Sequence, residues 1–496
     1  MHSTAVDTAT GRRVHRCVGQ RRPMSSAWLR PARLVIGPAA VSAAGFGAWT
    51  AGLPSPARIT VVVFVTALLL WIGTRVDETL VALGAAVVLV IAGVLNDTVL
   101  FGTLAASTIW LLIAAFMLAA GVSSTGLTTR VAARLIARAG SVRQLAHLVT
   151  AALVGTAFAV PATSGRAALA VPVFVALARV LTDRPRVVRA LAVLFPTVIL
   201  LSAIATLIGA GAHLVTNQIL AASTGLSVSF GQWLILGVPL AVVSAHTAAE
   251  LVLALFTRPA DRRIALRVPM AAIAAQVATP VTGRLSAAQR RAALVLAAVV
   301  LAWCAESLHG LDPALVALAG ALVLAVPGVS AVPAGEALKD VPWSLLLFMA
   351  GTAALATALI TSGAAGWLAG SVFGALEGSP TWLFLLVVIA LSVAAHLVVQ
   401  SRTARSAMLV PLVVPAAIAL GLNPVAIAFA STAAAGFCHT LTSSAKPVAM
   451  FARIDGVPTY DASDLLRLSA WLAPLTTALV LGCSLFVWPY LGLPLR

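Results

Sequence analysis

Two apolar stretches of this sequence, residues 159–181 and 398–420, are each interrupted by a short group of hydroxyl and basic residues. The groups are Thr163, Ser164, Gly165 and Arg166 in the earlier stretch, and Ser401, Arg402, Thr403 and Arg405 in the later one. Hydroxyl and guanidinium groups donate hydrogen bonds that suit a carboxylate, a sulfate or a phosphate. Charge at membrane depth costs several kcal/mol unless it faces protein or water. The pattern therefore predicts an anion-binding site.

We expect each stretch to form part of a re-entrant hairpin, within residues 146–183 and 381–420. Two half-helices that meet at a hairpin tip leave unpaired backbone N–H groups, and their positive dipole ends favour an anion. Neither 159–181 nor 398–420 contains Asp or Glu. A cationic pocket without a counter-charge is costly in a medium of low dielectric, so an anion should bind there. The alternative for each arginine is that it satisfies buried carbonyls or extends to the membrane surface.

Two further interruptions supply candidate ligands. Residues 209–213 (GAGAH) break one apolar run and end at His213, and residues 442–447 (TSSAKP) break another and contain Lys446. Lys446 could also compensate a charge or lie at the membrane edge. Broken helices in corresponding positions of two halves are typical of transporter binding sites.

The composition requires a membrane around these elements. Of the 496 residues, 61% are hydrophobic and 9% charged, with a mean hydropathy of +1.04. Such a chain is an all-α polytopic membrane protein, for which we predict about eleven transmembrane helices and two re-entrant hairpins. The net charge of +17 lies largely between the predicted spans, so it sets orientation and does not indicate nucleic-acid binding. The four cysteines share no metal-ligand spacing.

The basic segments place the N-terminus in the cytoplasm and the C-terminus outside the cell membrane. Residues 127–145 form an amphipathic helix that we expect to turn its basic face, with Arg130, Arg134 and Arg138, toward the headgroups. His246 and Glu250, one helical turn apart, form either a proton-sensitive pair or a helix edge without a role. The predicted segments are a basic tail (1–33), scaffold helices (34–145), a first hairpin with transport-domain helices (146–256), a cytoplasmic linker (257–291), further scaffold helices (292–380), and a second hairpin with transport-domain helices (381–496).

The two halves resemble each other. LVALGAAVVLVIAGVL (80–95) matches LVALAGALVLAVPGVS (315–330), and Trp110 and Trp343 open comparable spans at nearly the same separation. In the predicted topology the two copies run in opposite directions, which is an inverted repeat with one hairpin entering from each face. Chance similarity between segments rich in Ala, Leu and Val is the alternative.

From about residue 74 onward the order of these features resembles the divalent anion:sodium symporter family, whose members include citrate and dicarboxylate transporters. The resemblance covers WLLIAAFMLAAGVSSTGL (110–127), both hairpins, the break at 209–213 and FGQWLILGVPLAVV (230–243). It implies a homodimer in which a mobile transport domain moves against a scaffold by an elevator mechanism. It also implies sodium at the hairpin tips, but Thr163 and Arg402 stand where the family has asparagine, which argues against sodium coupling.

The function predicted is secondary transport of a small di- or oligovalent anion, such as a dicarboxylate, citrate or sulfate. No cofactor and no catalytic activity are expected. A cation/proton antiporter of the same superfamily is one alternative, although it would require carboxylates at the helix breaks. A membrane-embedded anion-binding enzyme or sensor is another, but the sequence offers no nucleophile–base or metal constellation.

Overall fold

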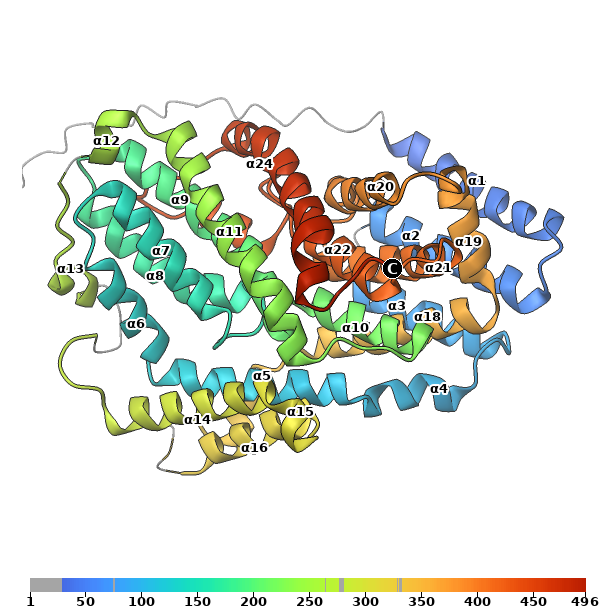
Figure 1. The fold of residues 1–496 in the computed structure, drawn as a ribbon, viewed down its shortest axis with the longest axis horizontal. Coiled ribbons are helices and arrows are strands. Elements are labelled where there is room, and N and C mark those ends of the chain that lie inside the picture. Colours follow the sequence, from blue (N-terminus) through green and yellow to red (C-terminus); the bar gives the residue numbers. More distant parts are fainter. Residues whose placement is uncertain (1–28, 75, 264, 276–280, 328, 330–331) are drawn as a thin grey trace, which may run out of the picture.

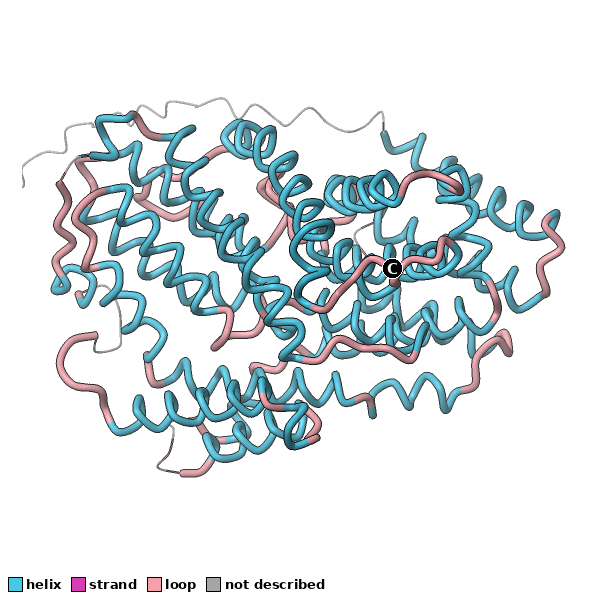
Figure 2. The backbone as a smooth tube through the Cα atoms, in the orientation of Figure 1, coloured by secondary structure: helices cyan, strands magenta, loops and turns pink. Residues whose placement is uncertain are grey.

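The apolar runs of the sequence form helices throughout the computed structural model, which describes residues 29–74, 76–263, 265–275, 281–327, 329 and 332–496. Figure 2 shows helices and loops without a strand in this part of the chain. The helices are α1 (Leu29–Thr50), α2 (Ser55–Gly73), α3 (Glu78–Ile91), α4 (Asp97–Gly102), α5 (Ser107–Ser124), α6 (Leu127–Ile136), α7 (Val142–Thr156), α8 (Thr163–Val180), α9 (Pro185–Leu201), α10 (Gly211–Thr224), α11 (Phe230–Phe256), α12 (Pro259–Arg263), α13 (Met270–Ala274), α14 (Ala287–Cys304), α15 (Glu306–His309), α16 (Pro313–Ala325), α17 (Ala334–Lys339), α18 (Trp343–Thr361), α19 (Ala364–Phe373), α20 (Thr381–Ala394), α21 (Arg402–Ala419), α22 (Pro424–Ala434), α23 (Lys446–Ala452) and α24 (Ala462–Gly482).

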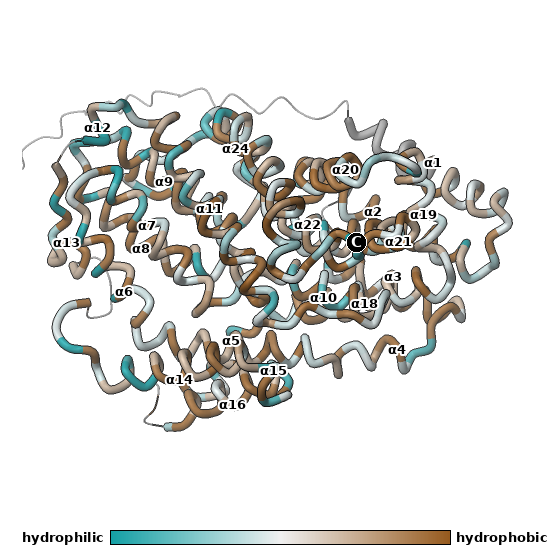
Figure 3. The backbone as a smooth tube through the Cα atoms, in the orientation of Figure 1, coloured by the Kyte–Doolittle hydropathy of each residue, from teal (hydrophilic) through white to brown (hydrophobic). Residues whose placement is uncertain are grey.

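The helices confirm the all-α polytopic class. Within the described ranges, nine helical runs are long and apolar enough to cross a membrane, or ten if the pair 364–376 and 381–397, bent by 118°, counts as one span. The count of about eleven predicted from the sequence includes α3, α16 and α22, which are apolar but shorter. Apolar residues dominate these helices in Figure 3. Residues 1–28 of the predicted basic tail lie outside the described residues.

The two halves of the chain interlock. Helix α3 of the first half packs on α18 of the second, and α16 of the second half packs on α5 of the first. The same exchange occurs at the hairpins, where α10 packs on α21 and α23 packs on α8. The repeat in the sequence pairs α3 with α16 and α5 with α18, so each contact appears twice with the halves exchanged. This reciprocity agrees with the predicted internal repeat (Figure 1).

Both predicted hairpins and both helix breaks are present. Helices α7 and α8 form the first hairpin, and α20 and α21 form the second. The first broken helix runs from α9 through the short 3₁₀ turns η3 (Ser202–Ala205) and η4 (Leu207–Gly209) into α10. The second runs from α22 through residues 435–445 into α23. Figure 1 shows α10, α21 and α22 near one another, to the right of the centre of the view.

Arg130 corrects one expectation from the sequence. It does not point toward the headgroups, because it is only 2% exposed. It donates to Gln289 Oε1 at 2.7 Å and to the carbonyl of Gly283, and Gln289 Nε2 donates to the Thr125 carbonyl at 3.0 Å. Arg130 therefore fastens the start of α14 to α6, while Arg134 and Arg138 stay exposed.

A close approach between α11 and the first break yields a stability prediction. A Cβ atom at Gly237 would lie 2.1 Å from the carbonyl oxygen of Ile204, a backbone atom that cannot move freely. Gly237→Ala should therefore destabilise the protein by about 1–3 kcal/mol or more through overpacking, measured as a lower melting temperature in detergent. Gly84→Ala on α3 is the matched control, since a Cβ there has nothing within 4 Å. Equal melting temperatures for the two variants would contradict the close approach.

Candidate functional site

The tip of the first hairpin turns on an unusual backbone conformation. Ala162 has φ of 64° and ψ of 137°, and among the described residues it is the one non-glycine with positive φ. This conformation is unfavourable for an L-residue and occurs mostly where function requires it. It leads directly into the first turn of α8, where Thr163, Ser164 and Gly165 lie half-buried. Their backbone N–H groups form the positive end of this helix.

Arg166 lies below this tip and is 1% exposed. Its Nε donates to Thr156 Oγ1 at 3.0 Å and its Nη1 to the Ile199 carbonyl at 3.0 Å. Its Nη2 donates to the Leu153 carbonyl at 2.6 Å and to Ser202 Oγ at 2.7 Å. Four protein acceptors thus occupy the guanidinium, which joins α7 to the point where α9 ends.

The tip of the second hairpin lies against the first helix break. Ser401 caps α21 by accepting a hydrogen bond from the Ala404 N–H at 3.2 Å. Thr403 Oγ1 and Leu345 of α18 both approach Gly211, where an added Cβ would lie 3.3 Å from the Thr403 oxygen and 2.9 Å from Leu345 Cδ1. The first residues of α10, the second tip and α18 therefore meet at one place. The sequence predicted the first two and missed the third.

Arg402 spans from the second hairpin to the first break. Its Nη2 donates to His213 Nε2 at 3.0 Å, and His213 Nδ1 donates to the Thr206 carbonyl at 3.0 Å. A guanidinium can only donate and a carbonyl can only accept, so these contacts require a neutral imidazole with its proton on Nδ1. On its other side Arg402 Nη2 packs against Gly436, where a Cβ would lie 3.0 Å away. Arg402 Nε and Nη1 are buried and have no hydrogen-bond partner in the described chain.

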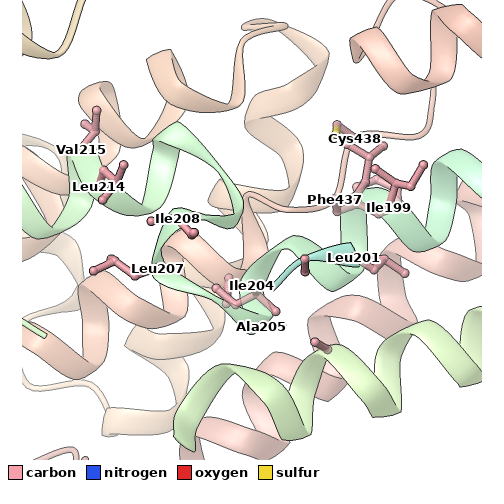
Figure 4. Packing of buried hydrophobic residues seen from close by; sticks show 14 of the residues in the cluster. Ile199, Leu201, Ile204, Ala205, Leu207, Ile208, Leu214, Val215, Phe437 and Cys438 are labelled. Carbon is pink, nitrogen blue, oxygen red and sulfur yellow. The ribbon is translucent and has the colours of Figure 1, made fainter. Parts of the chain in front are cut away.

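Arg405 contrasts with Arg166, its counterpart in the repeat. It is 0% exposed, and its Nη1 donates to the Phe437 carbonyl at 3.0 Å. Its Nε and Nη2 lack hydrogen-bond partners among the described residues, with the Cys438 thiol alongside. Figure 4 shows Phe437 and Cys438 within the apolar cluster that surrounds the first break. The guanidinium therefore combines apolar surroundings with unused donors.

Two neighbours of Arg405 extend this set of unpaired polar atoms. Ser406 Oγ is buried without a partner in the described chain. His439 Nδ1 accepts from the Cys438 N–H at 3.3 Å, so the proton of a neutral ring is on Nε2, which has no hydrogen-bond partner either. We name Arg402, Arg405, Ser406 and His439 the donor cluster. Buried polar groups are nearly always hydrogen-bonded, so such a cluster requires an explanation.

The remaining candidates lie apart from this cluster or support it. Lys446 is exposed at the first position of α23 and interacts electrostatically with Glu78 of α3. His213 is fully buried and acts through Arg402. From the sequence, His439 lies near the site but is expected to have a structural role, as a single histidine in an apolar run usually does. The signal available in the sequence was the position of His439 in the second helix break, which follows the hairpin that carries Arg405.

The described residues contain no group of three His, Cys, Asp or Glu side chains placed to hold a metal ion. The unpaired polar groups of the site are hydrogen-bond donors, which are suited to binding an anion. The donor cluster presents up to six N–H and O–H donors from two arginines, a serine and a histidine, without a carboxylate in the same helix turn.

Comparison with known proteins finds a matching family and several relatives. The sequence profile of a family described as the sodium:sulfate symporter transmembrane region matches residues 32–493. A "Membrane protein" of Cupriavidus necator is 25% identical over 394 residues, covering 77% of this chain and 74% of the relative. The sodium-dependent dicarboxylate transporter SdcS of Staphylococcus saprophyticus is 28% identical over 160 residues, covering 32% of this chain and 30% of that protein.

A solved structure shares the fold. The YdaH transporter of Alcanivorax borkumensis, which has an unusual topology, aligns with a TM-score of 0.54 at 17% identity, over 88% of this chain and 98% of that one. At this identity the likeness concerns the fold alone.

Proposed function

Since this chain belongs to the sodium:sulfate symporter transmembrane family and is a multi-pass membrane transporter, we propose that it carries a small di- or oligovalent anion of the dicarboxylate, citrate or sulfate kind. The observation that carries the proposal is the donor cluster, whose buried guanidinium atoms have no protein acceptor. An anion that received these hydrogen bonds would offset both the buried charge and the unpaired donors. The name of the relative SdcS supports a dicarboxylate.

The anion would lie between the second hairpin tip, the second break and the first residues of α10. Arg402 and Arg405 would bind its charged oxygens, with Ser406 and His439 as further donors. Ser401 and Thr403 at one tip, and Thr163, Ser164 and Gly165 at the other, would supply hydroxyl and backbone donors. Arg166 would support the first hairpin, because its donors are already occupied. Lys446, exposed at the edge of the second break, would attract the anion electrostatically.

The close approach of Leu345 to Gly211 supports a position for α18 beside the proposed site. We propose that the hairpins and broken helices move together against a scaffold that includes α18, in an elevator-type motion within a homodimer in the plasma membrane. A cation/proton antiporter fits less well, since the donor cluster consists of guanidinium, hydroxyl and imidazole groups, and the carboxylate near it, Glu78, interacts with Ser401 at the second tip.

Binding is tested by thermal stabilisation of the purified protein with succinate, citrate and sulfate. A ligand at 100 times its Kd stabilises by about 2.7 kcal/mol, which is a shift of a few degrees. We expect at least one of these anions, and not chloride, to raise the melting temperature. Absence of stabilisation by all three would contradict the proposal.

The position of Arg402 also predicts that anion transport is not coupled to sodium. Its guanidinium places a tethered positive charge at the second tip, so a bound sodium ion there would meet like-charge repulsion. We expect anion uptake into proteoliposomes to be unchanged when sodium is replaced by potassium. Collapse of uptake in potassium would show that Arg402 does not take the place of sodium.

A further inference from the structure

Away from the donor cluster, four polar side chains join α7 to α11. Arg143 Nε and His147 Nε2 each contact Glu250 Oε1 at 2.6 Å. On its other side His147 Nδ1 lies 2.8 Å from His246 Nδ1, and the two rings stack with centroids 5.1 Å apart. We name the continuous chain Glu250–His147–His246 the relay. The sequence indicated only the pair His246 and Glu250, because His147 comes from another helix.

The position of Glu250 sets it apart from the other carboxylates. Of the nine candidate spans in the described chain, α11 is the one with an acidic residue beyond its first turn, since Asp97 and Asp464 lie at the starts of theirs. An ionisable residue inside a span is a functional candidate by default. The side chains of His147 and Glu250 are 30% and 38% exposed, so neither group is sealed inside the protein.

The hydrogen bonds limit how many protons the relay can hold. A carboxylate accepts, so His147 Nε2 carries a proton, and the contact between the two Nδ1 atoms has room for one proton. With both rings neutral, His246 Nδ1 donates to His147 Nδ1, and His246 Nε2 is free to accept. Adding one proton to His246 Nε2 preserves the hydrogen bonds of His147 to Glu250 and to His246. The added positive charge then lies near the Glu250 carboxylate. A second added proton on the rings would require protons on both Nδ1 atoms, whose repulsion would separate α7 from α11.

We propose that the relay is the binding site of a coupling proton, so that each transported anion is accompanied by one proton held on Glu250, His147 and His246. This inference rests on the proposed anion transport and names its coupling ion. It also supplies a coupling ion for a transporter in which Arg402, at the second hairpin tip, disfavours sodium. An imidazole is suited to the task because its unperturbed pKa lies between pH 5 and 8.

The two helices that carry the relay also contact elements of the proposed anion site. Helix α7 is the first arm of the first hairpin. Helix α11 carries Trp233, whose Nε1 donates to the Ile204 carbonyl at 3.0 Å and whose ring lies 5.0 Å from the ring of His213. His213 in turn accepts from Arg402. A change in the spacing of α7 and α11 would therefore reach both the first hairpin and the donor cluster through packed groups.

The two carboxylates on the neighbouring elements, Asp261 and Asp464, are paired with other groups. Glu250 is therefore the carboxylate that serves the relay. Asp261 accepts from the Arg258 N–H at 2.9 Å, and Asp464 pairs with Arg189. The charged residues on elements packed against α7 and α11 are Arg130 and Arg134 on α6, Arg166 and Arg179 on α8, Arg186 and Arg189 on α9, Asp261, Arg262 and Arg263 on α12, Arg290 and Arg291 on α14, and Asp464 and Arg467 on α24.

The test measures accumulation of succinate or sulfate in proteoliposomes without sodium, with and without a pH gradient that is acid outside. A gradient of about one pH unit can drive about tenfold accumulation for each coupled proton. We expect this accumulation in the wild type and in His309→Gln, a control at an exposed histidine on α15. His147→Gln and His246→Gln, which keep a hydrogen-bonding side chain but cannot hold the proton, should lose the response to the gradient and retain stabilisation by the anion.

The possible failures are distinguishable. If the wild type binds and transports the anion but ignores the gradient, or if both glutamine variants still respond to it, the relay is not the coupling site although the transport function stands. If no tested anion binds or is taken up, the transport function fails, and the relay is judged by NMR titration of histidines in the purified chain. Titration of His246 that is the same in wild type and His147→Gln would then overturn it, whereas a shift would support a shared proton.

Discussion

We expect Arg405→Met to abolish anion binding while the anion-free protein remains as stable as the wild type, or becomes more stable. Arg405 is fully buried, and only its Nη1 has a protein hydrogen-bond partner in the described chain. Removing one partner of a buried, hydrogen-bonded charge pair costs about 2–5 kcal/mol, or about 30- to 4,000-fold in affinity. In the absence of anion the same guanidinium is an uncompensated buried charge. An apolar side chain of similar volume in such a place is often neutral or stabilising by about 1–4 kcal/mol.

The measurement is thermal denaturation with and without succinate, citrate or sulfate. Arg138→Met is the matched control, because Arg138 is exposed in the turn after α6 and should keep the anion response. Arg130 would be a poor control, since its burial against Gln289 makes its loss destabilising. Arg405→Lys keeps the charge but loses the planar pair of donors, so weakened binding is expected. An anion response in Arg405→Met equal to that of the wild type would remove Arg405 from the site.

The hairpins and breaks could be predicted because their causes are local. Pro161 and Gly165 disfavour a continuous helix around the first tip, and the polar run at 400–403 does so around the second. The same composition placed Arg402 and His213 near breaks, where the structure brings them within 3.0 Å of each other.

The roles of the two repeat arginines could not be predicted, because they depend on contacts distant in sequence. Each nitrogen of the Arg166 guanidinium has a hydrogen-bond acceptor. This is because α9 ends at Leu201, which brings the Ile199 carbonyl and Ser202 beside the guanidinium. Nothing in the pattern of the hairpin distinguishes it from Arg405. Arg130 was misjudged for the same reason, since its partner Gln289 lies across the linker. Periodicity identifies the face of a helix that carries charge, but not what covers that face.

This difference predicts the opposite outcome for the earlier arginine. We expect Arg166→Met to destabilise the protein by about 3–5 kcal/mol, because it leaves buried acceptors unpaired at the junction of α7, α8 and α9. The Ile199 and Leu153 carbonyls would each lose the donor that Arg166 provides, although Thr156 Oγ1 would still donate to the Leu153 carbonyl. Ser202 Oγ would keep only its own bond to the Val198 carbonyl. Variant protein that still folds should retain the anion-dependent gain in melting temperature, because the donor cluster is intact. Thermal denaturation of the two variants separates the roles of the arginines. Arg166→Met should lose stability and keep the anion response, whereas Arg405→Met should keep stability and lose the anion response. If Arg166→Met instead had wild-type stability and no anion response, the first hairpin would supply an anion ligand after all, and the site would be as symmetric as the repeat.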